Sequence, residues 1–173
     1  MSFLIDTDIC SAYLKGDRLV WKRFLQYSGG LHVSTVTAGE LFTWVLRANA
    51  SPARLQGLLD LLRDMTVLDV TLDVARKFGA VRAHLLDQGL AVPEMDLLIA
   101  STALVHGLTV VTHNVTDYAN IPGLTVVDWL ILPRHERSSR RTALLSRPEA
   151  ASALPDGSGE PSYVINFDAG VIP

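Results

Sequence analysis

The sequence predicts an α/β fold, a three-layer α/β/α sandwich with a central parallel five-stranded sheet. Three observations carry this prediction. The 173 residues suit one domain. Hydrophobic residues make up 49% of the chain and charged residues 19%, which is enough to build a core. Short apolar runs alternate with amphipathic stretches, and this alternation favours parallel strands joined by right-handed crossovers.

The first half of the chain opens on an apolar run that stops at Asp6, as a buried strand does. Gly16 and Gly29 interrupt the polar and amphipathic stretches that follow. Ser51 and Pro52 supply an N-cap and a first-turn proline for a later helix. We therefore expect, in chain order, a strand over 2–5, helices over 8–15 and 17–27, a strand over 31–36, a helix over 37–48 and a helix from 51.

The second half continues the alternation. An apolar stripe at helical spacing ends at Gly89, Pro93 opens the next helix, and Gly107 stops it. We expect a strand over 66–70, helices over 72–86 and 93–105, and strands over 108–112 and 124–127. Residues 112–116 are expected to form a loop.

The composition changes after residue 132. Only three of the eight prolines lie in 1–132, and the last 41 residues are rich in Pro, Ser, Gly and Arg. Such a composition favours a flexible extension. We expect a folded domain over 1–132 and a mostly disordered tail over 133–173, in which 142–145 could form a helical turn and 162–167 a strand.

Charge and cysteine content exclude several classes of protein. The net charge of −3 excludes a protein that coats nucleic acid with surplus Lys and Arg. The single cysteine, Cys10, excludes an internal disulfide and argues against a structural zinc held by cysteines. The first residues do not read as a signal peptide, and no apolar run is long enough to span a bilayer. We expect a cytoplasmic protein.

Four acidic residues are predicted to meet at the carboxyl edge of the sheet, where ligands bind in such folds. Asp6 follows the first strand, Glu40 lies in the first turn after the second, and Asp117 follows the fourth. Asp96 begins a helix that delivers the chain to the amino edge, so its own start lies at the carboxyl edge. Close carboxylates repel unless a cation joins them, and oxygen ligands suit Mg²⁺, with Mn²⁺ also possible.

Each acid also has a purely structural interpretation. Glu40 completes a capping box with Thr37. Asp96 in a first helical turn gains from the helix dipole, and Asp117 suits a turn. Asp6 or Asp8 could cap the first helix, and Asp8 suits that role better, so Asp8 is assigned first as the N-cap or as a support for the metal ligands. The coincidence of four acids on one edge favours a site.

Four segments resemble the motifs of PIN domains, in order along residues 2–132. They are LIDTDI at 4–9, the helix of Glu40, PEMDLLIA at 93–100 and THNVTDY at 112–118. The segment IPGL at 121–124, leading to Asp128 and Trp129, is similar to the end of VapC-type toxins of bacterial toxin–antitoxin pairs. The tail departs from that pattern, because such toxins normally end near Trp129.

The resemblance implies a Mg²⁺-dependent endoribonuclease with Asp6, Glu40, Asp96 and Asp117 as catalytic acids. Of these, Asp6, Asp96 and Asp117 are the metal ligands, supported by Asp8, Thr112 and Asn114. Asp8 stands where the family often has Asn, His113 where it often has Arg or Lys, and Tyr118 where Phe is usual. His113 is expected to be a solvent-facing loop residue.

The expected partners follow from the same resemblance. They are an RNA substrate such as tRNA or rRNA, a cognate antitoxin protein and a second copy of the chain. Phosphate contacts are assigned to Lys15, Arg18, Lys22 and Arg23, although a solvated helix face explains these residues equally well. An apolar groove for an antitoxin helix could be lined by Trp21, Phe24, Phe42 and Trp44, or these side chains could simply pack in the core.

Two other functions remain open from the sequence. Asp6 and Asp8 after a strand also look like the nucleophile loop of haloacid-dehalogenase-type phosphatases, but the domain has no lysine after Lys77 for that chemistry. The chain could also be a PIN-like scaffold that binds RNA or a partner without cutting.

Overall fold

The computed structural model describes residues 1–47 and 51–131, and it confirms the α/β sandwich with a parallel five-stranded sheet. The strand order is β3-β2-β1-β4-β5, and every neighbouring pair is parallel. The strands are short: β1 Phe3–Ile5, β2 Leu31–Ser34, β3 Thr66–Leu68, β4 Thr109–Val111 and β5 Val126–Val127.

Seven helices join the strands in the described residues. They are α1 Thr7–Leu14, α2 Arg18–Gln26, α3 Thr35–Val45, α4 Pro52–Arg63, α5 Leu72–Asp87, α6 Glu94–His106 and α7 Val115–Tyr118. Six of them correspond to predicted helices. The short helix α7 was expected to be a loop, because four residues are too few for a periodic pattern. None of the described helices is long and apolar enough to cross a membrane.

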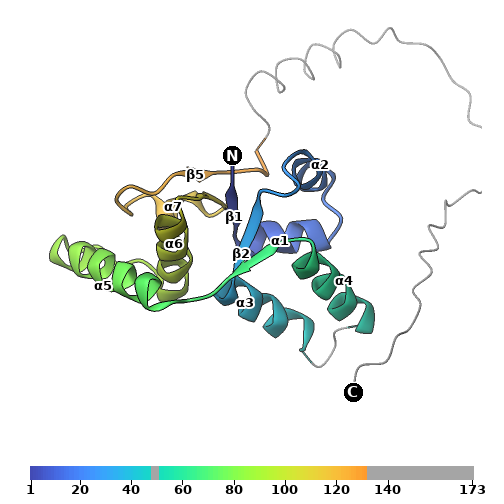
Figure 1. The fold of residues 1–173 in the computed structure, drawn as a ribbon, viewed down its shortest axis with the longest axis horizontal. Helices are drawn as coiled ribbons and strands as arrows, with labels where there is room; N and C mark the ends of the chain where they lie inside the picture. Colours follow the sequence, from blue (N-terminus) through green and yellow to red (C-terminus); the bar gives the residue numbers. More distant parts are fainter. Residues whose placement is uncertain (48–50, 132–173) are drawn as a thin grey trace, which may run out of the picture. The chain divides into compact units, whose positions relative to one another are not determined.

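Two hydrophobic cores lie on the two faces of the sheet. Side chains alternate along β1, so Phe3 and Ile5 join one core while Leu4 joins the other. The first core packs α1, α2, α3 and α4 against the sheet, and the second packs α5, α6 and α7. Figure 1 shows these two groups of helices on opposite sides of the strands.

An aromatic group ties the end of the described chain to its beginning. Trp129 stacks on Tyr27 with ring centroids 5.4 Å apart and meets Phe3 edge-on at 5.1 Å. Trp129 is only 6% exposed, so the segment after β5 belongs to this folded body. The predictions for 133–173, including its disorder, lie outside the described residues.

Local sequence explains where the helices near the site begin and end. Gly107, in the left-handed conformation with φ 64°, closes α6 and turns the chain into β4. Pro52 opens α4 as predicted, but Ser51 makes no side-chain cap hydrogen bond. The helix predicted from Thr37 begins earlier, because the Ser34 hydroxyl accepts from the Thr37 N–H and acts as the N-cap.

Candidate functional site

Asp6 lies at the carboxyl end of β1 and is held on both carboxylate oxygens. Oδ1 accepts from the Thr7 N–H at 2.7 Å, which makes Asp6 the N-cap of α1. Oδ2 accepts from the Tyr118 hydroxyl at 3.0 Å. The residue is only 6% exposed, and this burial raises the pKa of its carboxyl. Asp6 is therefore fixed in position, and its buried negative charge favours binding of a proton or a cation.

Glu40 lies on α3 and faces the start of α1. Its Oε2 accepts a hydrogen bond from the Thr7 hydroxyl. The predicted capping box is wrong: with Ser34 as the N-cap, Glu40 falls in the second turn, too far along α3 to reach the cap amide. Its carboxylate is thus available to the site and is oriented by Thr7.

Asp8 lies in the first turn of α1 and contacts the loop after β4. Its Oδ2 accepts from the His113 N–H at 2.7 Å and from the Thr112 hydroxyl at 3.3 Å. The prediction that Asp8 caps α1 is wrong, because Asp6 does so. Asp8 instead fastens the β4–α7 loop to α1, and its role in supporting the metal ligands stays a prediction.

Asp117 is placed by α7, the helix that the sequence pattern did not reveal. The Asn114 side-chain amide donates to Asp117 Oδ2, and the Asn114 backbone N–H donates to the Thr112 hydroxyl at 3.0 Å. Thr116 donates to Asn114 Oδ1 at 3.2 Å. Thr112 and Asn114 therefore shape the loop that presents Asp117.

Asp96, in the first turn of α6, shows that the four acids converge. The pKa of its carboxyl is raised to about 6, first by burial and then by the negative charges of Asp6, Asp117, Glu40 and Asp8. Helix α6 thus brings Asp96 to the same edge as the strand-end acids. We call Asp6, Glu40, Asp96 and Asp117 the acidic cluster.

Tyr118 is a site residue that sequence reasoning noted only as a departure from the usual Phe. It is 1% exposed in the second core, and its hydroxyl donates to Asp6. Burial, followed by the charge of Asp6, raises the pKa of this hydroxyl, so it stays protonated as a donor. The signal was the hydroxyl itself, because a buried phenol needs a partner.

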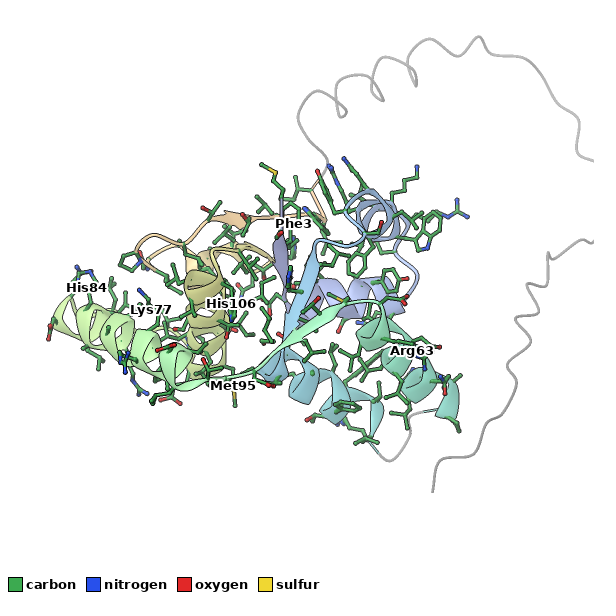
Figure 2. The ribbon with its side chains drawn as sticks, in the orientation of Figure 1. Phe3, Arg63, Lys77, His84, Met95 and His106 are labelled. Atoms are coloured by element: carbon green, nitrogen blue, oxygen red, sulfur yellow. The ribbon has the colours of Figure 1, made fainter. Side chains whose placement is uncertain are left out.

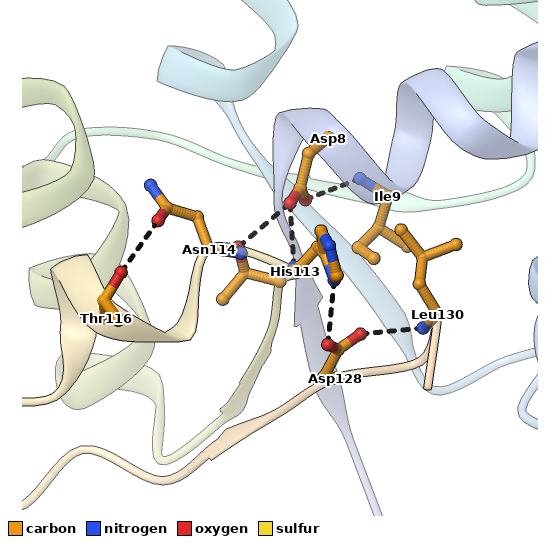
Figure 3. A network of polar contacts seen from close by, with 8 residues as sticks. Asp8, Ile9, His113, Asn114, Thr116, Asp128 and Leu130 are labelled. Carbon is orange, nitrogen blue, oxygen red and sulfur yellow. Dashed lines mark hydrogen bonds and ion pairs between the residues drawn. The ribbon is translucent and has the colours of Figure 1, made fainter. Parts of the chain in front are cut away.

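His113 and Asp128 form an ion-pair contact at the rim of the site, shown in Figure 3 with Asp8 above it. His113 Nδ1 lies 2.9 Å from Asp128 Oδ2, and the other oxygen of Asp128 accepts from the Leu130 N–H at 2.8 Å. The His113 side chain is 58% exposed, as expected for a solvent-facing loop residue. This contact ties the β4–α7 loop to the end of β5.

The donor set of the acidic cluster fits a hydrated divalent cation. Within 1–47 and 51–131, no group of three or more Asp, Glu, His or Cys side chains is arranged to hold a metal ion as it stands. Mg²⁺ keeps several waters and is commonly bound by only one or two carboxylates, so a closed protein shell is not required. Burial, followed by the negative charges of neighbouring acids, raises the pKa of Asp96, and a bound cation would neutralise those charges.

The four basic residues assigned to RNA do not form one group. Arg18, Lys22 and Arg23 all lie on α2, where Arg23 Nη1 donates to Gln26 Oε1. Lys15, at the end of α1, instead reaches the ring of Trp44 on α3. Arg54 on α4 reaches the same ring, and sequence reasoning did not single it out.

The four aromatic residues assigned to a groove do not all line the same cavity. Trp21 and Phe24 line a cavity of about 300 Å³ between α1, α2 and α4, together with Tyr13, Leu25 and Met65. Phe42 and Trp44 do not line it, and they pack at the border of the first core. Trp21 is 50% exposed, so this apolar hollow opens to solvent.

Comparison with known proteins gives one family. The PIN domain model matches residues 3–124. Ribonuclease VapC2 of Haemophilus influenzae is 28% identical over 75% of this chain and 99% of its own length. The tRNA(fMet)-specific endonuclease VapC of Shigella flexneri is 31% identical over 75% of this chain and 98% of its own length.

Solved structures give the same result. The DNA-bound VapBC of Salmonella typhimurium matches with a TM-score of 0.71 and 29% identity, over 75% of this chain and 98% of the other. A toxin–antitoxin complex from Klebsiella pneumoniae matches with a TM-score of 0.60 and 25% identity, over 73% of this chain and 96% of the other.

Proposed function

The chain belongs to the PIN-domain family as a ribonuclease toxin of the VapC type, and we propose that its acidic cluster is the catalytic centre. The activity we propose is Mg²⁺-dependent hydrolysis of phosphodiester bonds within RNA. The observation that carries this proposal is the convergence of carboxylates on one edge. Thr7, next to Asp6, donates to Glu40, and Tyr118, next to Asp117, donates to Asp6. Burial and then the charges of these acids raise the pKa of Asp96, which agrees with this arrangement.

The metal is proposed to bind Asp6, Asp96 and Asp117, either directly or through water, with Mn²⁺ able to replace Mg²⁺. When bound, such an ion activates a water molecule for attack on phosphorus and offsets charge on the attacking and leaving oxygens. Family membership supports metal dependence, and the oxygen-only donor set supports a hard cation.

The remaining residues of the site are proposed to hold the acids in place. Tyr118 and the Thr7 N–H fix Asp6, the Thr7 hydroxyl orients Glu40, and Asn114 orients Asp117. Asp8 keeps the β4–α7 loop against α1 through Thr112 and His113. Because these contacts exist before any ligand binds, little reorganisation is needed when the RNA phosphate arrives.

The proposed substrate is a structured RNA such as tRNA or rRNA. The Shigella relative is a tRNA(fMet)-specific endonuclease, which makes tRNA the first substrate to try. A phosphatase mechanism with Asp6 as nucleophile has no support, because the family is a different one and residues 78–132 contain no lysine for that chemistry.

A cognate antitoxin is the proposed regulatory partner, since a solved relative is described as a toxin–antitoxin complex. We assign its docking helix to the cavity lined by Trp21 and Phe24, because this hollow is apolar, open and bordered by three helices. Replacing Trp21 with Glu should then weaken antitoxin binding in a pull-down while leaving RNA cleavage intact. We also propose a homodimer, which light scattering of the purified chain will test.

The test of the proposed activity is to induce the chain in cells beside its Asp96→Asn variant and to map new RNA 5′ ends. Discrete ends that appear only with the parent chain are expected. In vitro, the purified parent should cut the same RNA with Mg²⁺ and stop when EDTA is added. Equal cleavage by the Asp96→Asn variant would reject the acidic cluster as the catalytic centre. Binding without any cutting by the parent would replace the enzyme with a non-catalytic scaffold.

A further inference from the structure

Trp44 brings two positive charges together at the junction of three helices. It lies on α3 and is half-buried against the first core. Lys15 Nζ, at the end of α1, lies 5.8 Å from the centre of the Trp44 ring, and Arg54 Cζ on α4 lies 5.3 Å from it. Both side chains are exposed to solvent. We call Lys15, Trp44 and Arg54 the cationic patch.

Neither cation of the patch has an acidic partner among the described residues. The ion pairs found in that part of the chain involve Arg63, Arg76, Arg82 and His113 instead. The acid nearest to Lys15 in sequence is Asp17, and its carboxylate is occupied as the N-cap of α2. Two like charges therefore share one aromatic ring without a counter-charge, which favours an anionic ligand from outside.

The patch lies close to the acidic cluster. Trp44 follows Glu40 by four residues on α3, so the two side chains lie on the same helix face, about 6 Å apart along the axis. The neighbouring helix α1 also contacts both the cluster and the patch. Thr7 at its start contacts Glu40, and Lys15 at its end contacts Trp44. Lys15 lies eight residues beyond Thr7, about 12 Å along α1, so a nucleic-acid strand at the cluster can reach the patch with a phosphate further along the strand.

We infer that Lys15 and Arg54, held over Trp44, form a phosphate-binding subsite for the RNA strand beside the acidic cluster. This inference rests on the proposed ribonuclease function. The cluster repels an RNA phosphate until a metal binds, whereas unpaired Lys and Arg attract one at any time. The ring restricts where the two flexible side chains lie, so less rotamer freedom is lost when phosphate binds. Together, cations and an aromatic ring are typical of single-stranded nucleic-acid sites.

The test measures the salt dependence of RNA binding. A labelled single-stranded RNA is titrated in EDTA, so that no cleavage occurs, with the parent chain and with Lys15→Gln/Arg54→Gln. Glutamine keeps part of each side-chain stem over the ring. Losing two phosphate contacts should lower the slope of log affinity against log salt by about 1.4, and weaken binding about tenfold at low salt.

The matched control is Arg76→Gln/Lys77→Gln, which removes the same two residue types from α5. Helix α5 packs in the second core, and Figure 2 shows Lys77 there, on the opposite side of the sheet from Arg63 of α4. The control changes the net charge equally but lies outside the cationic patch, so its slope should stay close to that of the parent. Trp44→Leu keeps both cations but removes the aromatic ring beneath them. This variant should weaken RNA binding about two- to threefold.

Each outcome decides the inference. Equal slopes for the patch and control variants would overturn it, as would a parent chain that binds no RNA. Loss of antitoxin binding with unchanged RNA affinity would overturn it too, and would make the patch a protein-docking surface. Thermal unfolding separates these results from misfolding, since the glutamine variants should keep the parental Tm. Failure of the parent to cut RNA with Mg²⁺ would reject the proposed function alone, since the salt slope is measured without cleavage.

Discussion

The acidic cluster and the cationic patch share helix α3, yet their charged side chains differ in burial and in the groups that contact them. The carboxylate of Asp6 in the cluster is buried and receives hydrogen bonds from neutral donors. The cations of the patch are exposed and lie over an aromatic ring. Rigid, partly buried acids suit chemistry, whereas exposed cations suit attraction of a polyanion. A chain of net charge −3 can therefore act on RNA by separating the two tasks.

The largest expected effect separates cleavage from binding at the cluster. Asp6→Asn or Asp96→Asn should lower RNA cleavage on the order of 10³-fold, because each change removes a proposed metal-binding charge. RNA affinity in EDTA should stay the same or rise, since a repelling charge is lost. Cleavage assays and anisotropy titrations measure the two quantities.

The matched control for these acids is Asp73→Asn on α5, where Asp73 pairs only with the exposed Arg76. This variant should cut RNA as the parent does. A comparable loss of cleavage in Asp73→Asn would show that general charge, rather than the cluster, controls the activity.

The second prediction concerns the Tyr118 hydroxyl, a neutral donor to the acidic cluster. Tyr118→Phe removes the hydroxyl that donates to buried Asp6, so the free energy of unfolding should fall by about 2 kcal/mol. Chemical denaturation measures the change. Tyr27→Phe is the control, because its hydroxyl only accepts from the exposed Gln26 amide at 3.3 Å, and it should cost less than about 0.5 kcal/mol. Equal costs would mean that the Asp6 contact contributes nothing special.

The third prediction follows from the pKa of Asp96, raised from 3.8 to about 6. Between these pH values the folded chain binds a proton that the unfolded chain has released, so the free energy of unfolding falls as pH rises. In EDTA, Asp96→Asn should therefore be more stable than the parent above pH 6, by about 1 kcal/mol after solvent screening of this partly buried group. The difference should vanish below pH 4, and a difference independent of pH would contradict the mutual repulsion of the acids.

The smallest effect is expected at the rim of the site. His113→Ala breaks an exposed contact with Asp128, so stability should change by less than about 0.5 kcal/mol. Cleavage should stay within about threefold of the parent, because the His113 backbone N–H that holds Asp8 remains. A tenfold loss of kcat would instead place the imidazole in the chemistry.

Much of the site was predictable because its residues are tied to strand ends. Asp6 directly follows an apolar run, and Asp96 lies three residues after a helix-opening proline, so both could be assigned to the carboxyl edge. Helix α7 was missed because it is only four residues long. The start of α3 was misplaced because Ser34 and Thr37 are both good N-caps, and only the folded chain shows which hydroxyl accepts the hydrogen bond.

The sequence by itself determined the succession of strands and of the longer helices along the chain, because each follows from a local hydrophobic pattern. It also determined the parallel sheet and the edge on which the acids lie, because these follow from chain direction. Only the tertiary structure decided which side chains touch. The pairing of Tyr118 with Asp6 joins residues 112 positions apart. The meeting of Lys15 and Arg54 at Trp44 depends on how α1, α3 and α4 pack. Such contacts depend on helix packing and side-chain rotamers, which no short stretch of sequence encodes.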